Sequence, residues 1–291
     1  MPPAGEKPLQ ARSGHSAATN PHRPAQATPP LWAGFRRSPL VDVLQFCLLV
    51  AGLLWLLAES AGRVGYNWQW YRIPRYLISI TDAGIVAGPL LVGLKMTLAI
   101  SLAGLCLALV FGLITAICRL SRSFVGRGLA VVYVETSRNT PLLIQIFFIY
   151  FVLGPAFGLE RLPAAILALS LFEGAYAAEI FRAGIESVAE GQLEAARSLG
   201  LTTFATYRHI IIPQAIRTVL PPLASQAISL IKDSALVSTI AIYDLTMQAQ
   251  AIIAESYLTF EIWFTVAAMY FAVTLILSLV VGILEKRLKL P

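Results

Sequence analysis

Charged side chains inside long apolar stretches are the first residues of this chain that could do chemistry. Lys95, Glu173 and Asp233 each lie in such a stretch, and the polar Ser234 directly follows the last of them. An ionisable group in an apolar run is costly unless it is paired or has a function. These four residues are therefore candidates for contact with a polar solute that passes through the protein.

Each candidate also has a simpler structural interpretation. Lys95 lies only about six residues into its run, so its stem can carry the ammonium group back to the interface. Glu173 has no Lys or Arg within four residues, and a hydrogen bond from another helix would satisfy it as well as a solute would. Lys232 and Asp233 are neighbours and point in different directions on a helix. Two glutamines are weaker candidates of the same kind: Gln145 and Gln226.

Two further pairs of charges have helical spacing. Glu135 and Arg138 are three residues apart, as are Glu179 and Arg182. Residues at this spacing share a helix face, so each pair is predicted to form a structural ion pair near an end of its helix.

Several classes of chemistry have no support in the sequence. There is no cluster of metal-ligating residues, no G-x-S-x-G turn and no phosphate-binding G-x-x-x-x-G-K-[ST] loop. The cysteines all lie in or beside apolar runs and have no metal-ligand spacing: Cys47, Cys106 and Cys118. We expect no catalytic residue, no metal and no cofactor.

The composition places the chain in a membrane. Of its 291 residues 57% are hydrophobic and 13% are charged, about half the usual share for a soluble domain. The net charge of +6 is spread between apolar runs, which favours membrane orientation over binding to nucleic acid.

Six apolar runs are long enough to be predicted as membrane spans. They lie at about 40–58, 90–118, 132–153, 163–181, 214–241 and 262–284. The third run contains Thr140-Pro141, and proline disfavours a helical residue before it, so a break is predicted there. The sequence predicts an all-α membrane helix bundle.

The distribution of basic residues predicts the orientation. With the N-terminus inside, the inner loops and ends carry 14 Lys and Arg residues and the outer loops carry 4. Both termini are therefore predicted to be cytoplasmic. The proline-rich tail 1–38 is predicted to be disordered. Segment 39–84 is predicted to hold the first span and an outer loop, whose run 66–71 is either an aromatic belt or a partner contact.

The cytoplasmic segment 182–213 is too polar to span and too rich in helix formers for a simple linker. A short helix is predicted from Glu190 to a left-handed Gly200, and Thr202 or Thr203 can cap a second helix. The small Ala195 allows the first helix to enter a partner's groove. The alternative is an amphipathic helix on the membrane surface.

This segment resembles the EAA loop of ABC importer permeases. It has Glu194-Ala195-Ala196, Gly200, Ile210 and Pro213 at the family's spacings, and departs only at Ile212, where the family usually has Leu. The resemblance to the polar amino acid subfamily continues outside the loop, over about residues 85–290. It rests on these runs: Gly93–Leu98, Arg138–Leu143, Gly174–Tyr176 with Glu179, Gly191-Gln192 and Lys232–Ser234.

The resemblance implies a five-helix permease core at 85–291, preceded by one extra span, with the coupling loop at about 186–213. A separate ABC ATPase subunit would dock on the residues that match the loop: Glu190, Gly191, Glu194, Ala195, Ala196, Gly200, Ile210 and Pro213. It implies a dimer of ATPase subunits, a second permease subunit and an extracytoplasmic binding protein that delivers a polar amino acid. The expected location is the bacterial inner membrane, in contact with membrane lipid.

An amino acid zwitterion needs donors for its carboxylate and acceptors for its ammonium group. Lys95, Glu173, Asp233 and Ser234 are the residues that the sequence offers for these roles. Two other classes compete with this interpretation. An ion-gradient-driven transporter or channel would share the hydrophobicity but has no reason to carry the loop, and a membrane enzyme would need catalytic groups that the sequence lacks.

Overall fold

The computed structural model describes residues 39–63, 65–81 and 84–288, and the chain divides into two compact units, 1–67 and 68–291. The predicted disordered tail lies outside the described residues. Nearly all described residues are in helices, which confirms the predicted all-helical membrane class.

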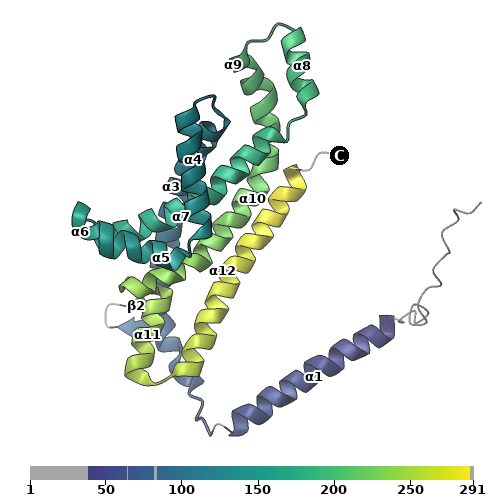
Figure 1. The fold of residues 1–291 in the computed structure, drawn as a ribbon. Coiled ribbons are helices and arrows are strands. Elements are labelled where there is room, and N and C mark those ends of the chain that lie inside the picture. Colours follow the sequence, from purple (N-terminus) through teal and green to yellow (C-terminus); the bar gives the residue numbers. More distant parts are fainter. Residues whose placement is uncertain (1–38, 64, 82–83, 289–291) are drawn as a thin grey trace, which may run out of the picture. The chain divides into compact units, whose positions relative to one another are not determined.

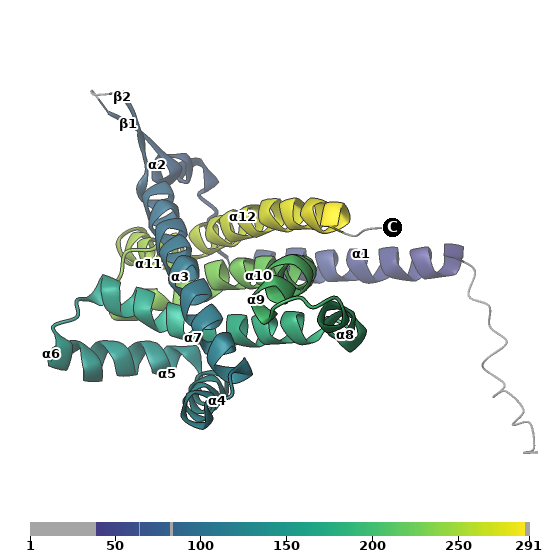
Figure 2. The same ribbon diagram turned by 90° about the horizontal axis from the view of Figure 1, so that it is seen from above.

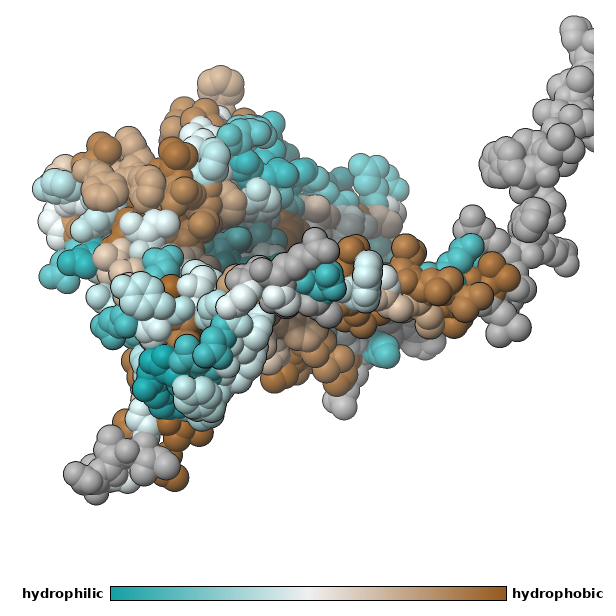
Figure 3. All heavy atoms as spheres, turned by 90° about the horizontal axis from the view of Figure 1, so that it is seen from below, coloured by the Kyte–Doolittle hydropathy of each residue, from teal (hydrophilic) through white to brown (hydrophobic). Residues whose placement is uncertain are grey.

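Helix α1 (Pro39–Arg63) makes up most of the described part of the first unit. Its 25 residues extend over about 37 Å, more than the hydrocarbon thickness of about 30 Å. The apolar part, Val41–Leu56, is exposed almost throughout, and Figure 3 shows α1 as a mainly hydrophobic rod. The helix predicted at 40–58 is present, and its role as a span stays a prediction.

The second unit begins with short elements before its first long helix. A two-stranded antiparallel hairpin, in which Ile78 pairs with Ala87, adds a feature that the sequence prediction lacked. The elements are η2 (Trp70–Arg72), α2 (Pro74–Leu77), β1 (Ile78–Thr81) and β2 (Gly84–Ala87).

Three helices are long and apolar enough to cross a membrane as single elements. They are α3 (Pro89–Leu120), α7 (Arg161–Glu186) and α12 (Thr259–Leu288). They correspond to the predicted spans 90–118, 163–181 and 262–284. Helices α3 and α7 pack against each other along much of their length, and α12 runs beside α10 (Figures 1 and 2).

The third predicted span is a broken one. Helix α4 ends at Asn139 and the next helix begins at Leu142, with a bend of 112° between them. Pro141, which lies at the bend, has no N–H to continue the helix, so the predicted break is confirmed. The elements are α4 (Phe124–Asn139), α5 (Leu142–Phe147), the π-helix η3 (Phe148–Leu153) and α6 (Gly154–Phe157).

The fifth predicted span is also bent, by 49°, and is longer than predicted. Segment 244–261, between the predicted spans 214–241 and 262–284, is expected to be an outer loop, and the structure adds that most of it is a helix capped by Asp244. Its carboxylate accepts a hydrogen bond from the Met247 N–H at 2.9 Å. The elements are α9 (Thr203–Thr206), the π-helix η4 (Tyr207–Ile211), α10 (Ile212–Asp233), the 3₁₀ helix η5 (Ser234–Ile240) and α11 (Leu245–Ser256).

Small residues set the close approach of α7 to its neighbours. A Cβ atom on Gly112 of α3 would lie 2.6 Å from the Ala177 Cβ, and one on Gly184 would lie 2.1 Å from a methyl group of Val219 on α10. Such small-residue contacts let membrane helices approach closely. The main hydrophobic core therefore lies where α3, α5, α7 and the end of α10 meet.

Candidate coupling and transport sites

Helix α8 (Glu190–Ser198) stands where the sequence predicts a short coupling helix. Gly200 adopts φ +71°, as predicted, and closes the helix with two hydrogen bonds. The Leu201 N–H donates to the Ala196 carbonyl at 3.1 Å, and the Gly200 N–H donates to the Arg197 carbonyl at 2.9 Å. This pair of bonds is a Schellman motif, which requires a residue that tolerates the left-handed conformation.

Helix α8 projects from the second unit and leaves most of its surface free. Figure 1 shows α8 and α9 together at one end of the long helices, away from α11 and the hairpin. Glu190, Gly191, Glu194 and Ala195 are exposed, and only Ala196 is buried. Among the described residues, the Glu194 carboxylate has no recorded hydrogen bond or ion pair. The helix therefore presents an unpaired carboxylate beside a small side chain.

The segment after α8 leads through α9 and η4 into α10. Thr202 caps α9, since its hydroxyl accepts from the Ala205 N–H at 3.2 Å. Pro213 lies in the first turn of α10 and has no N–H to donate to the carbonyl four residues before it. The chain forms the wide π-helical turn η4 directly before α10. Ile210 is half-buried in η4, whereas Pro213 is exposed. A continuous helical path therefore leads from the coupling loop into the span.

Two of the predicted pathway carboxyls meet inside the helix bundle. Glu173 on α7 is 1% exposed, and its Oε2 accepts a hydrogen bond from Gln226 on α10 at 2.6 Å. The carboxyl group of Asp233, two turns beyond Gln226 on α10, lies next to that of Glu173. The second oxygen of Glu173, Oε1, is buried without a hydrogen-bond partner. A buried acceptor of this kind favours a cationic or N–H-bearing ligand.

The other two predicted pathway residues are placed differently. Lys95 is exposed on the first turns of α3, as snorkelling to the interface requires. Ser234 is fully buried, and its hydroxyl donates to the Ile231 carbonyl at 2.8 Å. The structure therefore brings Glu173 and Asp233 together, with Lys95 on the exposed surface and Ser234 bonded to its own helix.

Of the two predicted ion pairs, one forms. Arg182 donates to Glu179 at 2.8 Å, and Arg119 at the end of α3 also pairs with Glu179. Glu135 and Arg138 do not pair, because Glu135 bonds Asn139 and the Arg138 guanidinium lies 5.3 Å from the centre of the Tyr176 ring. The ion pair between Arg119 and Glu179 could not be predicted from the sequence, because the two residues are 60 positions apart.

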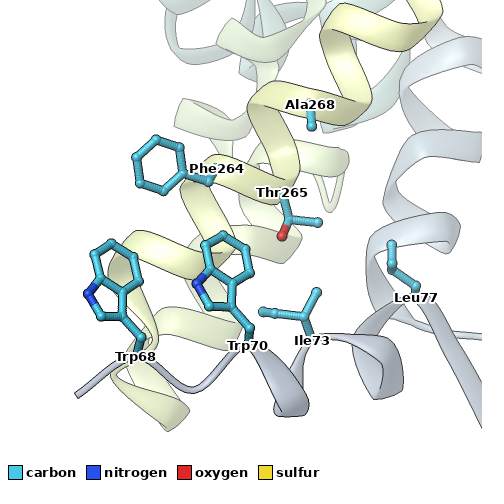
Figure 4. Close-up of a pocket in the computed structure, with 7 residues that line it drawn as sticks. All are labelled: Trp68, Trp70, Ile73, Leu77, Phe264, Thr265 and Ala268. Atoms are coloured by element: carbon cyan, nitrogen blue, oxygen red, sulfur yellow. The ribbon is translucent and has the colours of Figure 1, made fainter. Parts of the chain in front are cut away.

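Two tryptophans of the aromatic run 66–71 pack against α12. Trp68 and Trp70 stack with ring centres 5.9 Å apart, and Phe264 of α12 lies 6.3 Å from Trp70. Figure 4 shows these rings on one side of an open groove of about 820 Å³, with Ile73 and Leu77 opposite. The rings are half-exposed, so both alternatives, an aromatic belt and a partner contact, stay open.

Comparison with known proteins identifies the class. Residues 108–290 match the family described as "Binding-protein-dependent transport system inner membrane component". The match covers more than half of the chain and includes α8. The chain belongs to this family of membrane permeases. The prediction that it is the permease of an ABC importer is confirmed.

Individual relatives are amino acid permeases. The chain is 41% identical over 206 residues to the glutamine transport system permease protein GlnP of Escherichia coli (strain K12), covering 69% of this chain and 94% of that protein. It is 44% identical over 200 residues to a probable glutamine ABC transporter permease of Bacillus subtilis (strain 168), covering 67% and 91%. A crystal structure of an amino acid ABC transporter with histidines is similar, with a TM-score of 0.65, 40% identity and 68% and 94% coverage.

Proposed function

We propose that this permease imports a polar amino acid and that α8 is its contact with a separate ABC ATPase subunit. The observation that carries the proposal is the exposed, Schellman-capped helix that presents Glu194 and Ala195. A small-faced helix of this kind suits a groove on a partner, where Glu194 can accept a charge-assisted hydrogen bond. ATP binding would draw the ATPase subunits together, and η4 and α10 would transmit the movement of α8 to the spans.

The proposal includes three partners and an orientation. The ATPase subunits act as a dimer, a second permease subunit completes the pathway, and a binding protein delivers the amino acid from outside. The chain itself has no G-x-x-x-x-G-K-[ST] loop, in keeping with ATP hydrolysis by a partner. The 14 to 4 distribution of basic residues supports cytoplasmic termini and a cytoplasmic α8, in a bacterial inner membrane.

The domain boundaries belong to the same proposal. Segment 85–291 acts as the permease core and contains the coupling loop 186–213. Segment 39–84 supplies an extra span and an external loop, and the tail 1–38 is cytoplasmic.

The substrate contact is proposed at the carboxyl pair of Glu173 and Asp233. Their oxygens suit the ammonium group of an amino acid, and Glu173 Oε1 has an acceptor position without a protein donor. Lys95, nearer the outer end, would meet the substrate carboxylate on entry. Glutamine is the first substrate to test, since it is the amino acid named for two relatives, and histidine is the second.

The test is uptake of labelled glutamine and histidine by vesicles that contain the whole transporter. We expect uptake to require internal ATP and the binding protein, and to survive an ionophore. Uptake that follows an ion gradient and ignores ATP would refute the importer mechanism. Glu173→Gln and Asp233→Asn should each change the transport kinetics, and unchanged kinetics in both variants would refute the substrate contact.

A further inference from the structure

A second groove lies beside the coupling loop, and neither the coupling helix nor the carboxyl pair uses it. It encloses about 590 Å³ between α3, α7 and the start of α10. Its walls are apolar and include these residues: Leu113, Ile117, Phe181, Ile185, Ile216 and Val219. Tyr207 of η4 and Ser121, which follows α3, also line the groove.

Arginines lie next to two lining positions of this groove, Ser121 and Tyr207. Arg127 of α4 donates to the Ser121 carbonyl at 3.0 Å, which places its guanidinium group beside a lining residue. Arg122 follows Ser121 directly, and Arg208 follows the lining residue Tyr207; both are exposed. None of these three arginines forms an ion pair within the part of the chain that the structure describes. The groove therefore combines an apolar interior with the guanidinium group of Arg127 beside Ser121, and two further arginines adjoin its lining residues along the chain.

We propose that this groove binds an anionic phospholipid of the cytoplasmic leaflet. An acyl chain would fill the apolar interior, and the phosphate would lie among Arg122, Arg127 and Arg208. Arginine is suited to a phosphate because its planar group donates two parallel hydrogen bonds. Basic pockets between membrane helices on the cytoplasmic side are suited to anionic lipid headgroups. The inference rests on the proposed orientation, in which α8 is cytoplasmic.

The position of the groove gives the lipid a mechanical role. Tyr207 and Ile216 belong to the path that joins the coupling helix to α10, whereas Ile117 belongs to α3. A lipid between them contacts both the segment that moves with the ATPase and a helix of the core. ATP-driven uptake is therefore expected to be faster in vesicles with phosphatidylglycerol than in vesicles of phosphatidylcholine alone.

The test uses the full transporter and a photoactivatable phosphatidylglycerol, with labelled peptides identified by mass spectrometry. The label should reach α3 and α10 residues of the groove, and phosphatidylglycerol should compete with it better than phosphatidylcholine does. Ile216→Trp should narrow the groove and reduce the labelling. Each of Arg122→Gln, Arg127→Gln and Arg208→Gln should weaken labelling about fivefold. Arg75→Gln, on α2 at the other end of the long helices, removes the same charge and should leave labelling unchanged.

Three results would overturn the proposal. They are labelling outside the groove, equal competition by both lipids, and crosslinking of an Ile216→Cys variant to the second permease subunit through the new thiol. The last result would make the groove a subunit interface. Labelling does not require transport, so the two proposals can fail separately. Correct labelling without ATP-driven uptake refutes the importer mechanism, and ATP-driven uptake without groove labelling refutes the lipid site.

Discussion

Replacing Gly200 should weaken docking of the ATPase while leaving the membrane helices intact. The residue has φ +71°, and no atom lies within 4 Å of the position that a Cβ would take. A side chain at this position would therefore cost free energy through the strained backbone conformation and would not clash with neighbouring atoms. A left-handed residue other than glycine costs about 1–2 kcal/mol, which lowers the equilibrium constant for forming the capped loop by about 5- to 30-fold.

The three obvious substitutions should differ in a set order. Gly200→Asn should have the smallest effect because asparagine tolerates the left-handed region. Gly200→Ala should weaken ATPase affinity by up to about 5- to 30-fold, the limit set by the conformational penalty. Gly200→Val should weaken it further, since branching at Cβ makes this backbone conformation a strong outlier.

The assay is the affinity of the purified chain for its ATPase subunit in detergent, with ATP-driven uptake as the second measurement. Gly128→Ala is the matched control, because Gly128 lies within helix α4 and also has open space around its Cβ position. Its affinity should equal that of the wild type. If Gly200→Val also binds the ATPase with wild-type affinity, the capped loop is not the docking conformation and the reasoning fails.

Two further predictions concern stability in detergent, measured as thermal unfolding of the purified chain. Gly112→Val should destabilise strongly, by about 1–3 kcal/mol or more, because the Ala177 Cβ and the backbone of α7 leave no room. Gly282→Ala, in open space within α12, should not destabilise, because alanine is favoured over glycine in a helix by about 0.5–1 kcal/mol. Glu179→Gln should cost about 1.5–3 kcal/mol, because Arg119 and Arg182 both lose a charged hydrogen-bond acceptor. If Gly112→Val is as stable as the wild type, the close packing of α3 on α7 is contradicted. If Glu179→Gln is as stable as the wild type, the ion-pair network of Glu179 with Arg119 and Arg182 is contradicted.

Local features of this chain could be predicted from its sequence because neighbouring residues determine them. The coupling helix, its left-handed Gly200 and the break at Pro141 all depend on a few adjacent positions. Helix α11 was missed, although Asp244 before Leu245 is an ordinary N-cap signal. Segment 244–261 contains acidic residues and no Lys or Arg, and this composition favoured an outer loop over a helix that begins at Leu245.

Contacts across the bundle could not be predicted in the same way. That Glu173 meets Gln226 and Asp233 depends on the approach of α7 to α10, which Gly184 and Val219 set. The 112° angle after α4 likewise depends on packing, although its position could be predicted. The sequence could nominate Lys95 and Ser234 beside Glu173 and Asp233, but the fold alone decides which of them share a site.

The central claim is that α8 couples this permease to an ATPase. The most direct test is a pull-down of the tagged chain from its native membranes in mild detergent, with mass spectrometry of the co-purified proteins. The matched variants are Glu194→Ala on α8 and Glu255→Ala, an exposed carboxylate on α11. We predict that an ABC ATPase subunit co-purifies with the wild type and Glu255→Ala and is reduced with Glu194→Ala. Recovery of no ATPase with any of the three, even after mild crosslinking, would contradict the account.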